Sequence, residues 1–219
     1  MIPEAGPEFV CAMEAVLDVY ARPYDAARPV VCLDEKRKQL VKETRVGFTD
    51  SHGVRYEDHE YERNGVGVLY MVSEPLGGRR EVLVEESQDR LAWARTVTHM
   101  AERMYPEAER ITLVQDNLSA HKPSALYEIH PPERARAIVE RLEIVNTPKH
   151  GSWLNIAEVE LSVFSRQGLS KRVPDRAALS SQAAAWYGKR NEQQRDVEWQ
   201  FTTADARVKL ARLYPTVIT

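Results

Sequence analysis

The chain has 219 residues and a mass of 25.0 kDa, which is enough for one well-packed domain of moderate size. Its 43% apolar and 29% charged residues are ordinary for a globular protein and exclude wholesale disorder. The two cysteines, Cys11 and Cys32, are too few for a disulfide scaffold and form no CxxC pair. Because the sequence contains no long apolar run and no leader-like start, we expect a cytoplasmic protein with no membrane partner.

The net charge of -3 is unevenly distributed. Residues 161–219 contain ten Lys and Arg against five Asp and Glu, whereas residues 1–160 contain 20 against 28. Such a division is typical of a protein that gathers carboxylates around cations and contacts phosphate elsewhere, but ordinary solvated helix faces also produce it. Charge alone therefore assigns no function.

The first third of the chain predicts a helix and a strand, followed by a loop. Apolar residues recur at helical spacing over residues 8–20, and the prolines of residues 23–29 predict an extended connector. The apolar run 30–33 predicts a buried strand that ends at Asp34. We expect a long polar loop after it, with a further strand near Tyr61.

The middle of the chain predicts an antiparallel hairpin, because a double glycine separates the apolar runs 66–72 and 81–84. A core-facing helix is predicted from about Asp89, and a buried strand over 111–114 precedes Asp116.

The remainder predicts one more strand and several helices. The helices are expected near 124–128, 133–142, 155–166, 176–189 and 204–213, and the strand at 144–145. Strands that alternate with helices favour parallel pairing, while the hairpin requires antiparallel pairing. The sequence therefore predicts an α/β fold with a mixed five-stranded sheet flanked by helices.

Two acidic residues, Asp34 and Asp116, each follow a buried strand. Ligand sites cluster beyond the carboxyl ends of parallel strands, so these acids are expected to face one cleft, although an Asp in such a place is also a common turn former. Glu158 and Glu160 follow at the start of a helix, where positions two apart differ in direction by about 200°. Only one of them can serve the same site.

Glu158 is the better candidate for a third carboxylate. It shares its helix face with Ser162 and Ser165, whose small side chains leave room for an ion. The competing interpretation is a capping box between Asn155 and Glu158.

Three carboxylates from separate elements are what an oxygen-preferring cation such as Mg²⁺ requires. Two such ions roughly 4 Å apart can activate a nucleophile and stabilise the leaving oxygen of a phosphodiester. A Ser-His-Asp hydrolase is disfavoured because the sequence contains no GxSxG elbow. Zinc binding by His130 and His150 is conceivable, but isolated histidines are usually structural or surface groups.

Three sequence blocks resemble a known family. They are 33–35 (LDE), 113–117 (LVQDN) with His121, and 147–167 (TPKHGSWLNIAEVELSVFSRQ), and a fourth, 199–207, follows near the end. They look like the signature blocks of bacterial insertion-sequence transposases of the mariner-related ("six-thirty") branch, which have a DDE catalytic domain. The resemblance extends from about residue 9 to residue 215.

This resemblance implies a ribonuclease H-like fold in which Asp34, Asp116 and Glu158 are the catalytic residues and the metal ligands. The ions would be Mg²⁺ or Mn²⁺, as a pair. The implied activity is cleavage of DNA at transposon ends followed by joining to target DNA, usually at a TA dinucleotide. The implied partner is therefore DNA, and the protein would act at the bacterial nucleoid. A homodimer is compatible with the resemblance.

The resemblance divides the chain into an N-terminal helix and connector (1–29), the catalytic domain (30–170) and a C-terminal helical extension packed on it (171–219). Lys149, His150 and Arg166 are candidates for contacts with DNA. His121 could orient the site from just beyond Asp116, or it could be structural.

One departure from the family concerns DNA recognition. Relatives carry N-terminal helix-turn-helix modules, whereas fewer than about 35 residues precede Asp34 here. We therefore expect recognition of terminal repeats to belong to residues outside this chain or to a partner. Two alternatives stay open: a ribonuclease H-like nuclease without strand transfer, and a truncated, non-catalytic remnant that binds DNA or protein.

Overall fold

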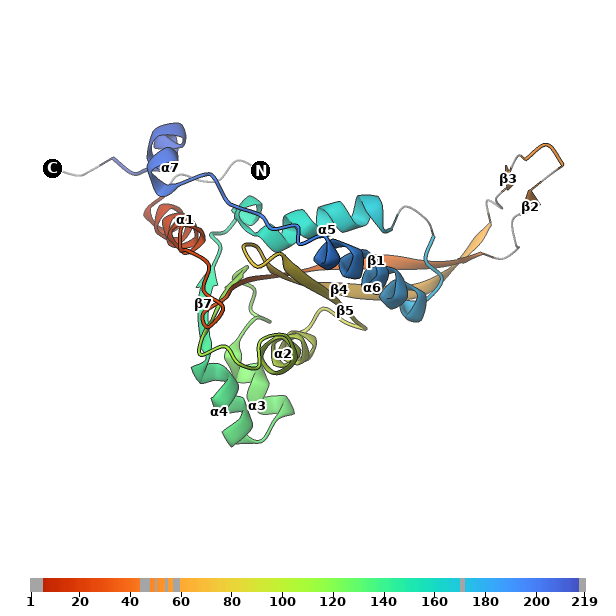
Figure 1. Ribbon diagram of the computed structural model, residues 1–219, viewed down its shortest axis with the longest axis horizontal. Helices are drawn as coiled ribbons and strands as arrows, with labels where there is room; N and C mark the ends of the chain where they lie inside the picture. The colour runs from red at the N-terminus through yellow and green to blue at the C-terminus, as the bar shows by residue number, and fades with distance from the viewer. Residues whose placement is uncertain are drawn as a thin grey trace.

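The computed structural model describes residues 6–43, 48–49, 51–53, 55–56, 60–169 and 172–216. Its centre is a five-stranded sheet with the strand order β5-β4-β1-β6-β7 and with helices on both faces (Figure 1). The strands are β1 (Val30–Glu43), β4 (Tyr61–Glu74), β5 (Arg79–Glu85), β6 (Ile111–Gln115) and β7 (Leu142–Asn146). The short strands β2 (Phe48–Thr49) and β3 (Arg55–Tyr56) form a separate pair.

The sheet is mixed, as the sequence predicts. The strands β1, β4 and β5 pair antiparallel, whereas β6 is parallel to both β1 and β7. The turn between β4 and β5 contains Gly78, whose φ of 63° lies in the left-handed region. A Cβ at this position would also lie 3.2 Å from the backbone nitrogen of Asp196, so both the conformation and the close approach require glycine. The predicted double-glycine hairpin is confirmed.

Helices cover the two faces of the sheet as two layers. The first layer comprises α1 (Pro7–Tyr20), α5 (Ile156–Gln167) and α6 (Arg176–Glu192), with α7 (Thr203–Lys209) and η4 (Ala211–Leu213) packed near α1. The second comprises α2 (Arg90–His99), its π-helical continuation η1 (Met100–Met104), α3 (Leu126–Ile129) and α4 (Pro132–Glu140). The 3₁₀ turns η2 (Pro123–Ala125) and η3 (Ser152–Leu154) lead into α3 and α5.

Each layer has its own apolar core because successive residues of a strand point to opposite faces of the sheet. In β1, Val31 and Leu33 pack in the core between the sheet and α2, which we call the α2 core. Cys32 packs in the core between the sheet and α5, the α5 core. The helices α1 and α6 share the α5 core, so the regions before residue 30 and after residue 170 contribute to the packing of the sheet. The domain boundaries at residues 29 and 170 stay a prediction.

The first strand differs from the sequence prediction. β1 does not end at Asp34 but continues to Glu43, paired with β4 from Tyr61 onward, so the expected polar loop is wrong over residues 36–43. This outer part of the β1–β4 pair extends away from the body of the molecule (Figure 1). The backbone of β1 in this part pairs with the neighbouring strand, and most of its described side chains there are exposed or half-buried, with Leu40 as the buried exception, so its sequence carries no sustained apolar pattern. Residues 44–47, 50, 54 and 57–59 of the expected loop lie outside the described residues.

None of the helices among the described residues has the length and apolar character needed to cross a membrane.

Candidate metal centre

Three elements bring Asp34, Asp116 and Glu158 to one cleft of about 450 Å³. Asp34 lies within β1, Asp116 is the first residue after β6, and Glu158 lies in the first turn of α5. The cleft is lined by Asp34, Glu35, Lys36, Asp116, Thr147, Ser152, Asn155, Glu158, Leu161 and Ser162.

The register of the parallel strands explains why the two aspartates meet. Cys32 of β1 pairs with Val114 of β6, and each aspartate follows its paired residue by two positions. Asp34 and Asp116 are therefore level with one another across the sheet, on neighbouring strands about 4.8 Å apart. The two acids face one cleft as predicted, although the reason is register and not a common strand end.

Asn155 fixes the start of α5 against β1. Its Oδ1 accepts a hydrogen bond of 3.1 Å from the backbone N–H of Ala157, and its Nδ2 donates one of 2.9 Å to the carbonyl of Leu33. The helix therefore begins beside the residue that precedes Asp34. The capping box of the competing interpretation is not formed, and Oε2 of Glu158 is buried without a hydrogen-bond partner among the described residues.

Glu160 lies away from the cleft, as the helix geometry predicts. Its side chain is 3% exposed, and its carboxylate forms ion pairs of 3.3 Å with Arg80 and 3.0 Å with Arg190. Glu158 faces the cleft together with Ser162, while Ser165 accepts a hydrogen bond from Nζ of Lys36.

The cleft concentrates negative charge. The pKa of Asp34 is raised to about 7, mainly by burial and also by the carboxylates of Glu35, Glu158 and Asp116, against the opposing effect of a hydrogen bond from the backbone N–H of Glu35. A carboxyl group that resists ionisation among other carboxylates would be stabilised in its charged form by a nearby cation.

The donor set fits a hard divalent cation. Carboxylate oxygens are the ligands that Mg²⁺ and Mn²⁺ prefer, and Glu158 contributes an oxygen that has no other described partner. Within the described ranges, no three His, Cys, Asp or Glu side chains form a complete ligand group. Mg²⁺ does not need one, because it usually keeps several waters and takes only one or two protein carboxylates.

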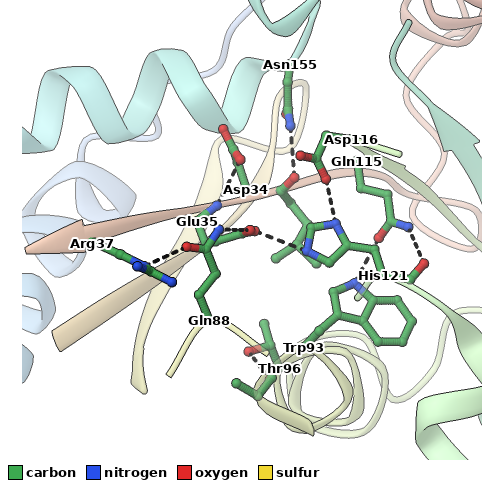
Figure 2. Close-up of polar contacts among 12 residues, drawn as sticks. Asp34, Glu35, Arg37, Gln88, Trp93, Thr96, Gln115, Asp116, His121 and Asn155 are labelled. Atoms are coloured by element: carbon green, nitrogen blue, oxygen red, sulfur yellow. Dashed lines mark hydrogen bonds and ion pairs between the residues drawn. The ribbon is translucent and has the colours of Figure 1, made fainter. Parts of the chain in front are cut away.

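A buried histidine joins this cleft to the α2 layer (Figure 2). The side chain of His121 is 2% exposed, with Nδ1 2.6 Å from Oδ1 of Asp116 and Nε2 3.3 Å from Oε2 of Glu35. Burial lowers the pKa of His121, but its contacts with Asp116 and Glu35 outweigh burial and raise the pKa to about 9. The imidazole is therefore cationic at neutral pH and offsets part of the negative charge.

The α2 layer holds His121 in place. The Trp93 ring stacks on the imidazole with 6.1 Å between ring centroids, and its Nε1 donates a hydrogen bond of 2.9 Å to Oε1 of Gln115. The amide nitrogen of Gln115 in turn donates to the carbonyl of His121. The last residue of β6 therefore fixes both the backbone of His121 and the ring beside it.

Glu35 has its own support on the same side. Nε2 of Gln88 donates a hydrogen bond of 2.7 Å to Glu35, and Nε of Arg37 donates one of 2.9 Å to Oε1 of Gln88 (Figure 2). The sequence prediction gave no role to Glu35 or Gln88. The acidic pair Asp34-Glu35 was the available signal, but only the fold shows that His121 lies between Glu35 and Asp116.

The three candidates for DNA contact lie outside the lining of the cleft. Lys149 and His150 are exposed in the turn after β7, and Arg166 is exposed on α5. His150 has a φ of 64°. Their contact with DNA stays a prediction.

Comparison with known proteins places this geometry in a family. The model of the family described as DDE superfamily endonuclease matches residues 29–180, a range that contains all three cleft carboxylates. Comparison with curated proteins gives no match.

Solved structures of the mariner Mos1 protein share the fold. Its paired end complex with Mg aligns with a TM-score of 0.59 and 15% identity over 100% of this chain and 66% of that one. The Mos1 strand transfer complex aligns with a TM-score of 0.55 and 14% identity over 86% and 59%. The paired end complex with Mn aligns with a TM-score of 0.54 and 16% identity over 89% of this chain and 60% of that one. This chain therefore spans about three fifths of the Mos1 chains.

The likeness to Mos1 confirms the predicted ribonuclease H-like fold, with its mixed five-stranded sheet flanked by helices. The family match covers well over half of the residues and includes the cleft. The chain therefore belongs to the DDE superfamily endonuclease family.

Proposed function

We propose that this chain is the catalytic part of a transposase, of the mariner-related branch of bacterial insertion sequences, that cleaves transposon ends and joins them to target DNA. The observation that carries the proposal is the meeting of Asp34, Asp116 and Glu158 at one cleft, on three separate elements of a DDE-family fold. The solved structures that share the fold are described as paired end and strand transfer complexes of Mos1, which supports the same reaction class.

The three carboxylates would hold one or two Mg²⁺ or Mn²⁺ ions. Bound divalent cations lower the pKa of water and stabilise the leaving oxygen of a phosphodiester. Asp34 supplies a carboxylate from a strand that is paired beyond it, and Glu158 supplies an oxygen with no described partner. His121 orients the Asp116 carboxylate, and Glu35, which also lines the cleft, contacts the other nitrogen of the His121 ring.

Other cleft residues suit a phosphate substrate. Lys36 lines the cleft, and Ser165 holds its Nζ at 3.0 Å, so an ammonium group is fixed beside the carboxylates. A lysine here can attract a phosphate oxygen while the carboxylates retain the metal. Because the substrate is DNA, we expect the protein to act at the bacterial nucleoid.

The experiment is nicking of supercoiled plasmid by the full chain with Mg²⁺, with Mn²⁺ and with EDTA. We expect metal-dependent nicking that disappears in Asp34→Ala and persists in Asp25→Ala, the same change at an exposed acid. Absence of metal-dependent nicking by the folded wild-type chain would favour the non-catalytic remnant.

A second assay separates the transposase from a simple nuclease. A short duplex with a free 3′-hydroxyl is incubated with plasmid, and covalent joining of the two is measured. Joining that requires the metal and Asp116 supports strand transfer. Nicking without joining would favour the ribonuclease H-like nuclease.

A further inference from the structure

A basic groove lies on the α5–α6 side of the sheet. It has a volume of about 580 Å³ and runs between the C-terminal end of α5 and the second half of α6. Its lining includes Lys189, Arg190 and Arg195, the amide side chains of Gln167 and Gln182, and the ring of Trp186. No carboxylate is among its described lining residues. We call it the α5–α6 groove.

The cations of this groove lack the partners that many other surface arginines have. Elsewhere, Arg134 pairs with Glu102 at 2.6 Å, and Arg95 pairs with Glu85 at the same distance. The side chain of Lys189 forms no ion pair or hydrogen bond with the described part of the chain. Nε of Arg195 donates to an amide oxygen, that of Gln193, at 2.8 Å. Both charges are therefore available to a ligand.

The floor of the groove is also positive. Arg190 lies over the Trp186 ring at 5.1 Å and donates to Glu160, but Glu160 also pairs with the fully buried Arg80. One carboxylate thus faces two guanidinium groups, and Nε of Arg190 is buried without a hydrogen-bond partner among the described residues. An anion bound over the groove would offset the excess positive charge of these two guanidinium groups.

Basic side chains link the groove to the metal centre. Lys36 lines both the carboxylate cleft and a smaller hollow of about 160 Å³, which Lys38 and Leu169 also line. Nζ of Lys38 donates to the carbonyl of Leu169. Gln167 and Gly168, immediately before Leu169, line the α5–α6 groove. The lysines therefore lead from the cleft, round the end of α5, to the groove.

We propose that the α5–α6 groove binds the phosphate backbone of the DNA whose scissile phosphate lies in the carboxylate cleft. This proposal rests on the proposed function and extends it to a second contact surface. Lys and Arg bind phosphate through charge-assisted hydrogen bonds, and glutamine amides also donate to phosphate oxygens. Lys36 and Lys38, on the side of α5 that leads from the cleft toward the groove, favour DNA over an acidic protein, because a phosphate backbone that enters the cleft would also pass these lysines.

The test is DNA binding by the full chain carrying Lys189→Ala and Arg195→Ala. Fluorescence anisotropy measures affinity for a labelled duplex over a series of KCl concentrations, in EDTA so that no cleavage occurs. Loss of two phosphate contacts should lower affinity on the order of tenfold and reduce the slope of log affinity against log salt by about 2. The control, Arg103→Ala with Arg110→Ala, removes the same charge from exposed residues away from the groove.

The control should change affinity and slope much less than the groove variant. Equal losses in the two variants, or an unchanged slope in the groove variant, would overturn the proposal. So would a groove variant that loses affinity for poly-glutamate but not for DNA, because that result identifies an acidic protein as the occupant. Plasmid nicking by the wild-type chain tests the proposed function separately, since binding in EDTA requires no catalysis.

Discussion

The side-chain amide of Asn155 donates a hydrogen bond to the carbonyl of Leu33, 122 positions earlier in the chain. The same side chain caps α5 through the backbone N–H of Ala157. One residue thus fixes the helix that carries Glu158 against the strand that carries Asp34. Its two contacts can be separated by mutation.

We expect Asn155→Ala to lower the free energy of unfolding by about 1–3 kcal/mol, because the helix cap and a buried hydrogen bond are both lost. Asn155→Asp retains the cap acceptor but cannot donate to Leu33. If the link to β1 positions Glu158, the Asp variant should lose metal-dependent nicking despite an intact helix. Urea unfolding and plasmid nicking measure the two effects, and full activity in Asn155→Asp would contradict the positioning role.

Asp116→Asn should abolish nicking while the protein stays folded, because the amide keeps the shape of the side chain but loses the charge that a divalent cation needs. Circular dichroism and nicking with Mg²⁺ are the measurements. Asp25→Asn, at an exposed residue outside the cleft, is the control for loss of one carboxylate. Appreciable activity in folded Asp116→Asn would remove Asp116 from the proposed triad.

The two glutamates of α5 should respond in opposite ways. Glu158→Gln should lose activity without loss of stability, because Oε2 of Glu158 has no described hydrogen-bond partner. Glu160→Gln should destabilise the fold by roughly 3 kcal/mol, since Arg80 and Arg190 lose their shared carboxylate, yet the folded fraction should remain active. The reverse ranking of activities would exchange their roles.

The stability of the metal-free protein should fall as pH rises from about 4 to about 9. Asp34 has a folded-state pKa raised to about 7, so above its unfolded value of 3.8 the folded chain binds a proton that the unfolded chain has lost. His121 has a pKa raised to about 9, so its stabilising contribution is complete below 6.5 and is lost as pH rises through 9. Each group can change the free energy of unfolding by up to about 1.4 kcal/mol per pH unit within its own range.

Urea unfolding in EDTA at pH 5, 7 and 8.5 measures this dependence. Asp34→Asn should flatten the change between pH 5 and 7, and His121→Gln should flatten the change above pH 7. Mg²⁺ should stabilise the wild-type chain more at high pH, because the cation competes with protons for the carboxylates. An Asp34→Asn profile identical to that of the wild type would contradict the assigned pKa.

Local patterns in the sequence were enough to predict the succession of the central strands along the chain and the helix that carries Glu158. The apolar runs mark the strands of the sheet, and Asn155 marks the helix start. The outer half of β1 could not be predicted in this way, because most of its side chains are polar and only Leu40 among those described is buried. The expected strand end at Asp34 was therefore wrong, even though Asp34 reaches the cleft.

The supporting residues of the centre depend on tertiary contacts that leave no local signal. Glu35 is adjacent to Asp34, and alternation along a strand points it to the opposite face. Its contact with His121, which in turn contacts Asp116, becomes visible only in the folded chain. The α5–α6 groove also leaves no local signal in the sequence, because Gln167 and Arg195 come together only through the packing of α6.

The continuation of β1 beyond Asp34 has a consequence for amide hydrogen exchange. The backbone at Asp34 lies within a long paired strand, so its exchange requires opening of the central sheet. Asp116, just beyond the end of β6, and Glu158, in the first turn of α5, can exchange through local fraying. Divalent cation should therefore slow exchange at Asp116 and Glu158 and leave exchange at Asp34 almost unchanged. The segment that carries Asp34 is then already ordered without the ion, whereas the segments that carry the other two carboxylates become more ordered when the ion binds.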